Sequence, residues 1–371
     1  VINCAGYKIK EVFLVYINSE YLFKNIIEPE KLFKIARVTG NVTHLSLHPV
    51  KQELSSLSDV LAKKKSPTPT IGRHCFYPEK CPYLDACEKN KPKKNSALDI
   101  PGLSEKDKLR LIMNDEEDVQ DITKTKFRLD ELEIIKAIQK KKPRIDLPKV
   151  RKYLNEVKFP LFFVNIESFS SAVPFIDDTT PYQHLPFHFS VLKISAEGTQ
   201  TNLKYTAPSA YGDFMKSFLV ELIKGTEETG TIVFKNETFQ IKMLEKLSTQ
   251  FPDYSEEIDN IIKRSIYLMR LFRDRNLFFP DLKGSHTFLN VLKYFFPDFN
   301  TERLHDQVEV GFSFINMEDL RIQEQGGKLK EIERGSLQYA LAMYKVFETM
   351  EFLVKESKRS KTPEKAKELA M

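Results

Sequence analysis

The sequence predicts a mixed α/β fold in which helices flank a central sheet. Residues 161–164 (LFFV) form a short apolar run directly after Pro160, and the run is rich in strand-forming residues. A second run of this kind, 187–194, predicts an antiparallel neighbouring strand. Residues 211–224 carry apolar side chains at intervals of four, which is typical of a helix that packs on a sheet.

Other elements in the second half of the chain follow from the same periodicities. Strand-forming runs predict further strands, at 203–206 and 231–234. Apolar residues at helical spacing predict further helices, which begin at 236 and span 257–272, 285–296 and 337–354. The alternation of strands and helices indicates that residues 156–350 form one α/β domain.

The chain has 371 residues, which is long enough for two domains with separate cores. Shifts in composition divide it into a first domain, a helical charged connector, the α/β domain and a basic tail, at 1–90, 91–155, 156–350 and 351–371. In the first domain we expect a strand at 10–17 and helices at 28–36 and 50–64. In the connector we expect helices at 104–114 and 129–142.

The composition is mildly basic, with 57 Lys and Arg against 52 Asp and Glu, for a formal net charge of +5. This excess alone does not identify a nucleic-acid-binding protein, and the lysine clusters are typical of solvated surface. No run reaches the ~18 apolar residues that cross a bilayer, and the N-terminus lacks a secretory signal. We therefore expect a soluble, cytoplasmic protein with no membrane contact. Because strand-like sequence follows so soon after Val1, we also expect Val1 to be an internal position of a longer polypeptide.

Three cysteines lie close together in the first domain, at Cys75, Cys81 and Cys87. In a reducing cytoplasm this grouping favours metal or cluster ligation over disulfides. Their wide, equal spacing does not match the close pairs typical of structural zinc sites. An iron–sulfur cluster tolerates such spacing but needs four thiolates. Cys4 and His74 are alternative fourth ligands, and three free thiols are the alternative to ligation.

Polar side chains follow the first strand of the α/β domain. Asn165 and Glu167 alternate with Ile166, so both polar side chains point to one face of the strand. His184 and His188 flank the start of the second strand with a spacing of four, which places both on one face if the chain is extended. Core and surface histidines are commoner than ligands, so this spacing does not assign them a metal.

Three short motifs make the chain similar to a bacterial family of unassigned function, domain of unknown function 2779. The motifs are NIESF at 165–169, PYQ at 181–183 and LPF at 185–187. Their order and spacing resemble the family pattern of Asp-x-Glu-Thr, Pro-Tyr-Gln and x-Pro-Phe-Gln, and the resemblance extends over most of residues 1–350. Members of that family resemble a RecB-like PD-(D/E)XK nuclease half with a cysteine cluster, fused to an RNase H-like exonuclease half of the DEDD kind.

The resemblance implies a fold for both parts of the chain. Residues 156–350 would form an RNase H-like mixed sheet flanked by helices. Residues 1–90 would be the C-terminal remnant of a RecB-like domain, whose catalytic residues lie upstream of Val1. The fourth cysteine of an iron–sulfur cluster held by the three cysteines would lie upstream as well.

The resemblance also implies where a catalytic metal site would lie. DEDD enzymes hydrolyse phosphodiesters with two Mg²⁺ or Mn²⁺ ions held by four carboxylates. The positions that match the family's acids are Asn165, Glu167, Gln240 and Tyr267, and the closing helix lacks the family's last aspartate. Only Glu167 keeps a carboxylate that can bind metal. Since neutral side chains cannot balance two divalent ions, these departures indicate a fold retained after its metal site was lost.

Three functions stay open at this point. We expect a nuclease-family protein that binds nucleic acid and has a degenerate metal site. The alternatives are an active metal-dependent exonuclease with a rebuilt site, and a structural or protein-interaction module. A basic groove beside Glu167 would favour the first two over the third, and clustered carboxylates around Glu167 would favour the active enzyme.

Overall fold

The structure is a computed structural model in which two units can be distinguished. Unit 1 comprises Val1–Lys91 and Ser171–Gln183, and unit 2 comprises Pro92–Ser170 and His184–Met371. The residues that the structure describes are 8–46, 50–65, 75, 79, 81–83, 86–87, 100–114, 116, 118–122, 127–301, 304 and 307–359.

Unit 1 is built on an antiparallel pair of strands, β1 and β2. A small core of Tyr21, Phe23 and Leu32 lies beside this pair. The backbone N–H of Phe23 donates to the Thr179 carbonyl at 3.0 Å, which holds the segment 171–183 within the unit. The elements of unit 1 are β1 (Phe13–Ile17), α1 (Pro29–Leu32), β2 (Phe33–Arg37), α2 (Thr39–Ser46) and α3 (Val50–Leu61).

The helix predicted at 28–36 is only partly correct. Its first half is α1, but its second half is strand β2. The segment becomes a strand because its backbone pairs with β1, from Phe13 opposite Arg37 to Ile17 opposite Phe33. Apolar residues at 32–36 fit either element, so periodicity alone could not separate them.

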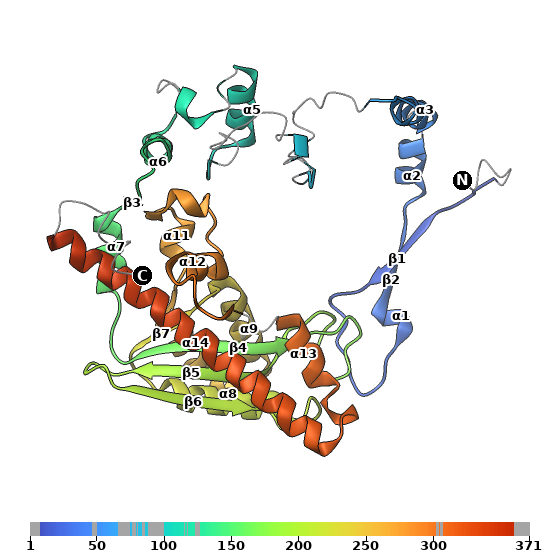
Figure 1. The fold of residues 1–371 in the computed structure, drawn as a ribbon. Helices are drawn as coiled ribbons and strands as arrows, with labels where there is room; N and C mark the ends of the chain where they lie inside the picture. The colour runs from blue at the N-terminus through green and yellow to red at the C-terminus, as the bar shows by residue number, and fades with distance from the viewer. Residues whose placement is uncertain are drawn as a thin grey trace. The chain divides into compact units, whose positions relative to one another are not determined.

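Unit 2 contains a sheet with the strand order β6-β5-β4-β7-β8 (Figure 1). Three strands, β4 to β6, are antiparallel neighbours, and β7 and β8 continue the sheet parallel to β4. The strands are β4 (Leu161–Phe169), β5 (Leu185–Ile194), β6 (Gln200–Thr206), β7 (Thr231–Phe234) and β8 (Ser265–Tyr267). The predicted mixed α/β class, with helices flanking a mixed sheet, is confirmed.

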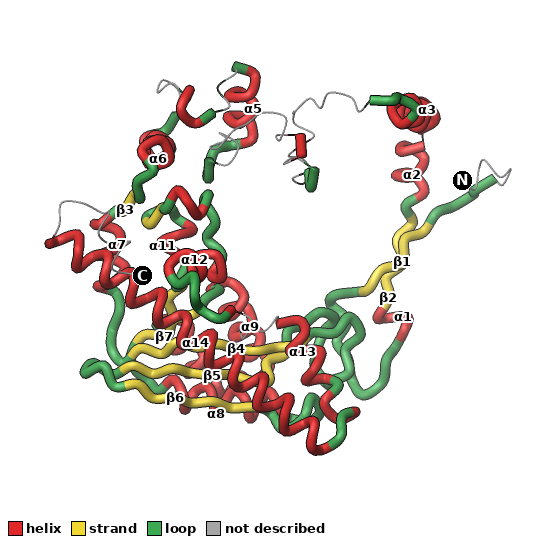
Figure 2. Tube along the Cα trace, viewed as in Figure 1, coloured by secondary structure: helices red, strands yellow, loops and turns green. Residues whose placement is uncertain are grey.

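Helices lie on both faces of this sheet (Figure 2). On one face α14 (Ile322–Arg359) packs on β4 and β5, and its Ser336 is hydrogen bonded to Asn165. On the other face α8 (Phe214–Thr226) packs on β5 and β6, and the rings of Phe218 and Phe189 meet edge-on with 5.6 Å between centroids. The helices that follow are α9 (Glu237–Gln250), α10 (Ser255–Lys263), α11 (Arg270–Arg273), α12 (Phe288–Phe295) and α13 (Gln307–Ile315).

Strand β4 is buried along its whole length because helices cover both of its faces. On the α14 side, the Phe163 ring contacts the rings of Tyr344 and Phe347, with centroids 5.3 and 5.6 Å away. Complete burial of a side chain of this size contributes about 1.5–3 kcal/mol. These contacts fix α14 across the central strands, where it can reach the polar end of β4.

The helix predicted at 257–272 is wrong. The segment divides into α10, β8 and α11. The chain turns into a strand because Ile232 N–H donates to the Arg264 carbonyl at 3.1 Å and Leu268 N–H donates to the Phe234 carbonyl at 2.9 Å. Backbone hydrogen bonds with β7 thus replace helical ones. The closing helix is also longer than expected, since α14 begins at Ile322 rather than at residue 337.

The helices predicted in the connector are present in unit 2. Ile100, Leu111 and Ile134 form a small core there with Phe278. The elements around it are α5 (Glu105–Met113), α6 (Leu129–Lys140), β3 (Arg144–Ile145), α7 (Leu147–Asn155) and β9 (Leu277–Phe278). In the described part of the chain, no helix combines the length and the apolar character that crossing a membrane requires.

Candidate functional site

The middle and second half of β4 carry two buried polar side chains, Asn165 and Glu167, which are 0% and 2% exposed. The Asn165 Nδ2 group donates to Glu167 Oε1 at 2.6 Å and to Ser336 Oγ of α14 at 3.0 Å. Asn165 Oδ1 accepts a hydrogen bond from Lys235 Nζ at 2.8 Å. The amide of Asn165 therefore links the central strand, the end of β7 and α14.

Lys235 directly follows β7 and brings a positive charge into this site. Its Nζ atom lies 3.6 Å from the centroid of the Tyr339 ring of α14, within the range of a cation–π interaction. Burial of the ammonium group lowers the pKa of Lys235 to about 8, and the nearby charge of Glu167 opposes this shift. Lys235 is therefore mainly protonated at pH 7. The polar cluster is defined as Asn165, Glu167, Lys235, Ser336 and Tyr339.

Polar side chains continue from the cluster onto β5 and β6. In the strand register, Asn165 lies opposite Ser190 and Glu167 lies opposite His188. The ring nitrogens of the buried His188 are hydrogen bonded to Thr206 Oγ1 at 2.8 Å and to Ser190 Oγ at 3.1 Å. Burial is the main cause that lowers the pKa of His188 to about 3. The imidazole is therefore neutral at pH 7 and acts as a hydrogen-bonding group.

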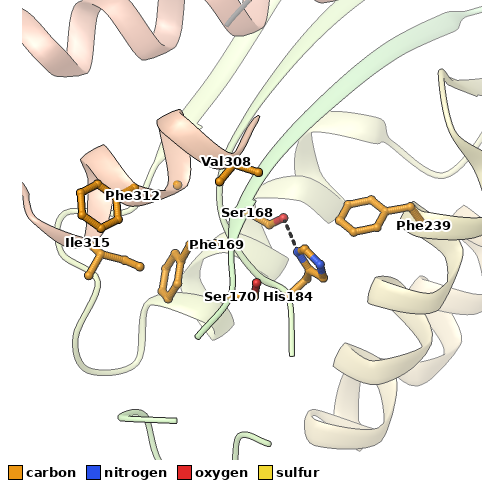
Figure 3. Close-up of a pocket in the computed structure, with 9 residues that line it drawn as sticks. Ser168, Phe169, Ser170, His184, Phe239, Val308, Phe312 and Ile315 are labelled. Atoms are coloured by element: carbon orange, nitrogen blue, oxygen red, sulfur yellow. Dashed lines mark hydrogen bonds between the residues drawn. The ribbon is translucent and has the colours of Figure 1, made fainter. Parts of the chain in front are cut away.

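An open pocket lies where β4 ends (Figure 3). A β-bulge between Glu167 and Ser168 shifts the register there, and bulges often redirect side chains beside functional sites. Ser168 Oγ and His184 Nδ1 are within hydrogen-bonding distance, at 3.3 Å. The His184 ring meets the Phe239 ring edge-on, with 4.7 Å between centroids. Burial lowers the pKa of His184, so the pocket contains a neutral imidazole beside a hydroxyl at pH 7.

Helix α13 supplies an apolar wall of this pocket. Val308 and Phe312 of α13 are 81% and 70% exposed, and Figure 3 shows Phe239 on the opposite side of the Ser168–His184 pair. Apolar and aromatic walls around a few polar groups are typical of pockets that bind small ligands. The pocket can therefore offer both apolar contact and hydrogen bonds to a ligand.

The family comparison covers the central part of unit 2. Residues 162–287 match the model of a family described as Domain of unknown function (DUF2779). The matched segment contains Asn165, Glu167 and Lys235, and it ends before Ser336. Over this segment the match supports the family that the sequence motifs resemble. No curated protein and no solved structure matches the chain.

The other two predicted metal-site positions in the DUF2779 segment have different surroundings. Gln240 lies buried on α9, and neither amide atom of its side chain has a hydrogen-bond partner among the described residues. Tyr267 is the last residue of β8, and its backbone oxygen accepts a hydrogen bond from the Tyr153 hydroxyl at 3.0 Å. Of the four predicted positions, hydrogen bonding joins Asn165 to Glu167.

His184 and His188 lie in different environments, although their spacing placed them on one face. His184 precedes β5 and lines the pocket of Figure 3, whereas His188 lies within β5 and bonds to Thr206 and Ser190. The alternation of an extended strand therefore does not reach His184.

Sequence reasoning missed Lys235 and Ser336. Lys235 follows a strand that was predicted at 231–234, and a polar residue at the carboxyl end of a strand is a usable signal for a site. Ser336 carried no such signal, because it lies within a helix and before the predicted helix start.

The three cysteines lie in unit 1. Cys75 is buried, Cys81 and Cys87 are partly buried, and none of the three forms a disulfide. The backbone N–H of Cys81 donates to the Cys75 carbonyl at 2.9 Å, so these two residues lie close together. Cys4 and His74 lie outside the described residues. Cluster ligation by the three cysteines stays a prediction.

The polar cluster does not fit a pair of divalent metal ions. Two-metal hydrolysis needs several carboxylates, whereas the cluster contains one, Glu167, and a lysine ammonium bound to Asn165. A cation at this position repels Mg²⁺ and Mn²⁺. Among the residues described, no group of three or more His, Cys, Asp and Glu is placed to hold a metal ion. In this arrangement the positive charge beside Glu167 comes from the protein itself.

Proposed function

We propose that unit 2 is an RNase H-like domain that binds nucleic acid and has lost the metal site of the DEDD exonucleases. The strand order supports this fold, because three antiparallel strands are followed by two parallel strands with α9 and α10 between them. In open α/β sheets, ligands bind at the carboxyl ends of the strands. Glu167 and Lys235 lie toward the carboxyl ends of β4 and β7, and the open pocket where β4 ends is the place where such a ligand would bind.

The hydrogen bond between Lys235 Nζ and Asn165 Oδ1 carries the proposal. It puts an ammonium ion beside Glu167, at the end of the central strand, where a nuclease would need a metal ion. An asparagine and a lysine together stabilise this end of the sheet without metal. The cluster thus takes the place of a metal site inside the fold, and ligand binding falls to the open pocket beside it.

The pocket of Figure 3 supports nucleic acid as the ligand. Single-stranded nucleic acids bind to proteins by stacking bases on aromatic side chains. Phe239 and the exposed Phe312 offer such faces. Ser168 and His184 can exchange hydrogen bonds with the edge of a base.

Binding and cleavage by the whole chain test the proposal together. We expect the fluorescence anisotropy of a labelled single-stranded DNA or RNA to rise when the protein is added in EDTA. We expect the same oligonucleotide to stay intact when it is incubated with the protein in Mn²⁺. Mn²⁺-dependent cleavage that is lost in Glu167→Ala would instead establish an active exonuclease. Absence of binding to both nucleic acids would favour a structural or protein-interaction module.

A double variant tests the role of Lys235 directly. Asn165→Asp with Lys235→Ala adds a carboxylate and removes the ammonium group, so we expect calorimetric titration to show Mn²⁺ binding at least about tenfold tighter than in the wild type. The matched control is Asn165→Asp alone, which keeps the ammonium group and should gain less. Equal Mn²⁺ affinity in the wild type and the double variant would contradict the loss of the metal site.

A further inference from the structure

A second pocket lies between α14 and the edge of the sheet formed by β5 and β6. Its volume is about 320 Å³, well above the roughly 10–15 Å³ that a single water molecule needs. Lys204 and Ser190 line it from the strands, and Lys330, Glu333 and Arg334 line it from α14. It therefore has room for a hydrated or partly dehydrated anion between a helix and a strand.

The positive charge of this pocket is only partly balanced. Lys204 forms an ion pair with Glu333. Lys330 and Arg334 are exposed and four residues apart, so they lie on one side of α14. Neither has an ion-pair partner among the described residues. Two cationic groups therefore remain available at the mouth of the pocket.

The pocket adjoins the polar cluster through the strand register. Asn165 lies opposite Ser190, and Ser190 lies opposite Lys204, so these three residues form one row across the sheet. Ser190 lines the pocket, while Asn165 belongs to the polar cluster. The pocket therefore lies beside the buried polar cluster, on the same row of the sheet.

We propose that this pocket binds a phosphate group of a nucleic-acid backbone, an inference that rests on the proposed function of unit 2. Arg334 supplies a planar fork of donors that matches two phosphate oxygens, and Lys330 supplies a second cation. The Lys204–Glu333 pair limits the net charge and holds the β6 side of the pocket in place. The site contacts the backbone and so accepts any base sequence.

Charge-removing variants of the whole chain test the site. We expect Lys330→Gln with Arg334→Gln to weaken binding of a labelled single strand roughly tenfold or more. The slope of log K against log salt should fall by about 0.7, the value for one lost phosphate contact on a single strand. The matched control is Lys216→Gln with Lys224→Gln on α8, which removes the same charge on the opposite face and should leave the affinity and the slope unchanged. Both pairs are exposed, and thermal unfolding checks that each variant is folded.

The outcomes separate this site from the proposed function. If both double variants weaken oligonucleotide binding equally, or if neither weakens it, the phosphate site is overturned. The proposed nucleic-acid binding stands in both cases. Titration with inorganic phosphate supplies a second readout. Phosphate binding that is lost in the α14 double variant, in a protein that binds no oligonucleotide, supports an anion site and overturns nucleic-acid binding. No binding of oligonucleotide or phosphate overturns both.

Discussion

At the residue scale, the Asn165 amide offers a hydrogen-bond donor or acceptor to each of its partners. Its Nδ2 group donates to Glu167 and Ser336, and its Oδ1 atom accepts from Lys235. A carboxylate at this position would meet the Glu167 carboxylate with no proton between them, and two such groups cannot both ionise at close range. An asparagine at residue 165 can therefore accept a hydrogen bond from the lysine and donate one to Glu167 at the same time.

The pH dependence of stability reports on Lys235. Its pKa is about 8 in the folded chain and near 10.5 in the unfolded chain, so the unfolded state holds more protons between these two values. The free energy of unfolding of the wild type should therefore rise across this window, by up to about 3 kcal/mol relative to Lys235→Met. Urea unfolding of both proteins from pH 7 to pH 10.5 measures this difference. Parallel profiles would show that the ammonium group is not buried.

Gln240 offers a test of a buried polar group. Its amide has no hydrogen-bond partner among the described residues, so Gln240→Met should raise the free energy of unfolding by about 1 kcal/mol. The matched control is Asn165→Leu, which also removes a buried amide but breaks three hydrogen bonds and should lower that free energy by about 2 kcal/mol. A loss of stability in Gln240→Met would show that this amide is satisfied in solution.

At the element scale, the position of α13 depends on a close approach to β4. A Cβ atom on Gly311 would lie 2.9 Å from the Ser168 carbonyl oxygen and 3.1 Å from the Phe169 Cβ atom. These atoms belong to the central strand, which helices hold on both faces. The wall that α13 gives the pocket of Figure 3 therefore requires glycine at 311.

Gly311→Ala should lower the free energy of unfolding by about 1–3 kcal/mol, since α13 must move away from β4. The matched control is Gly326→Ala in α14, where no atom lies within 4 Å of the added Cβ atom. That change should raise stability by about 0.5–1 kcal/mol, because alanine favours a helix more than glycine does. Thermal unfolding compares the two variants. A stabilised Gly311→Ala would contradict the close packing of α13 on β4.

At the scale of the whole molecule, the chain contains two units with different candidate chemistry. Unit 1 holds the three cysteines, and unit 2 holds the polar cluster and both pockets. The formal charge of +5 is small for 371 residues. Local charge, as at Lys330 and Arg334, therefore matters more for ligand binding than the total.

The three cysteines of unit 1 predict that the chain binds iron. We expect anaerobic reconstitution of the whole chain with iron and sulfide to give bound iron and visible absorption, and Cys81→Ser to lose most of both, because thiolates hold such clusters. Cys4→Ser tests the fourth ligand, because a cluster needs four thiolates and Cys4 is the one other cysteine of the sequence. Elemental analysis measures iron per chain. The same iron content in the wild type and Cys81→Ser would show that Cys81 is not a ligand.

Part of this fold was predictable from local sequence. The strands at β4, β5 and β7 correspond to apolar runs, and α8 corresponds to a single apolar face. The face that Asn165 and Glu167 share follows from alternation along one strand. β8 was not predictable in this way, because three residues of strand look like part of a helix until β7 pairs with them.

The sequence by itself determined the mixed α/β class, the strand that carries Asn165 and Glu167, and the lack of an aspartate at residue 165. Each of these depends on residues that are neighbours in the chain. Only the tertiary structure decided that Lys235 and Ser336 meet Asn165, across 70 and 171 positions of sequence. The physical reason is that these contacts depend on the order of strands and on where α14 crosses the sheet. Burial then sets the charge state of the groups that are brought together.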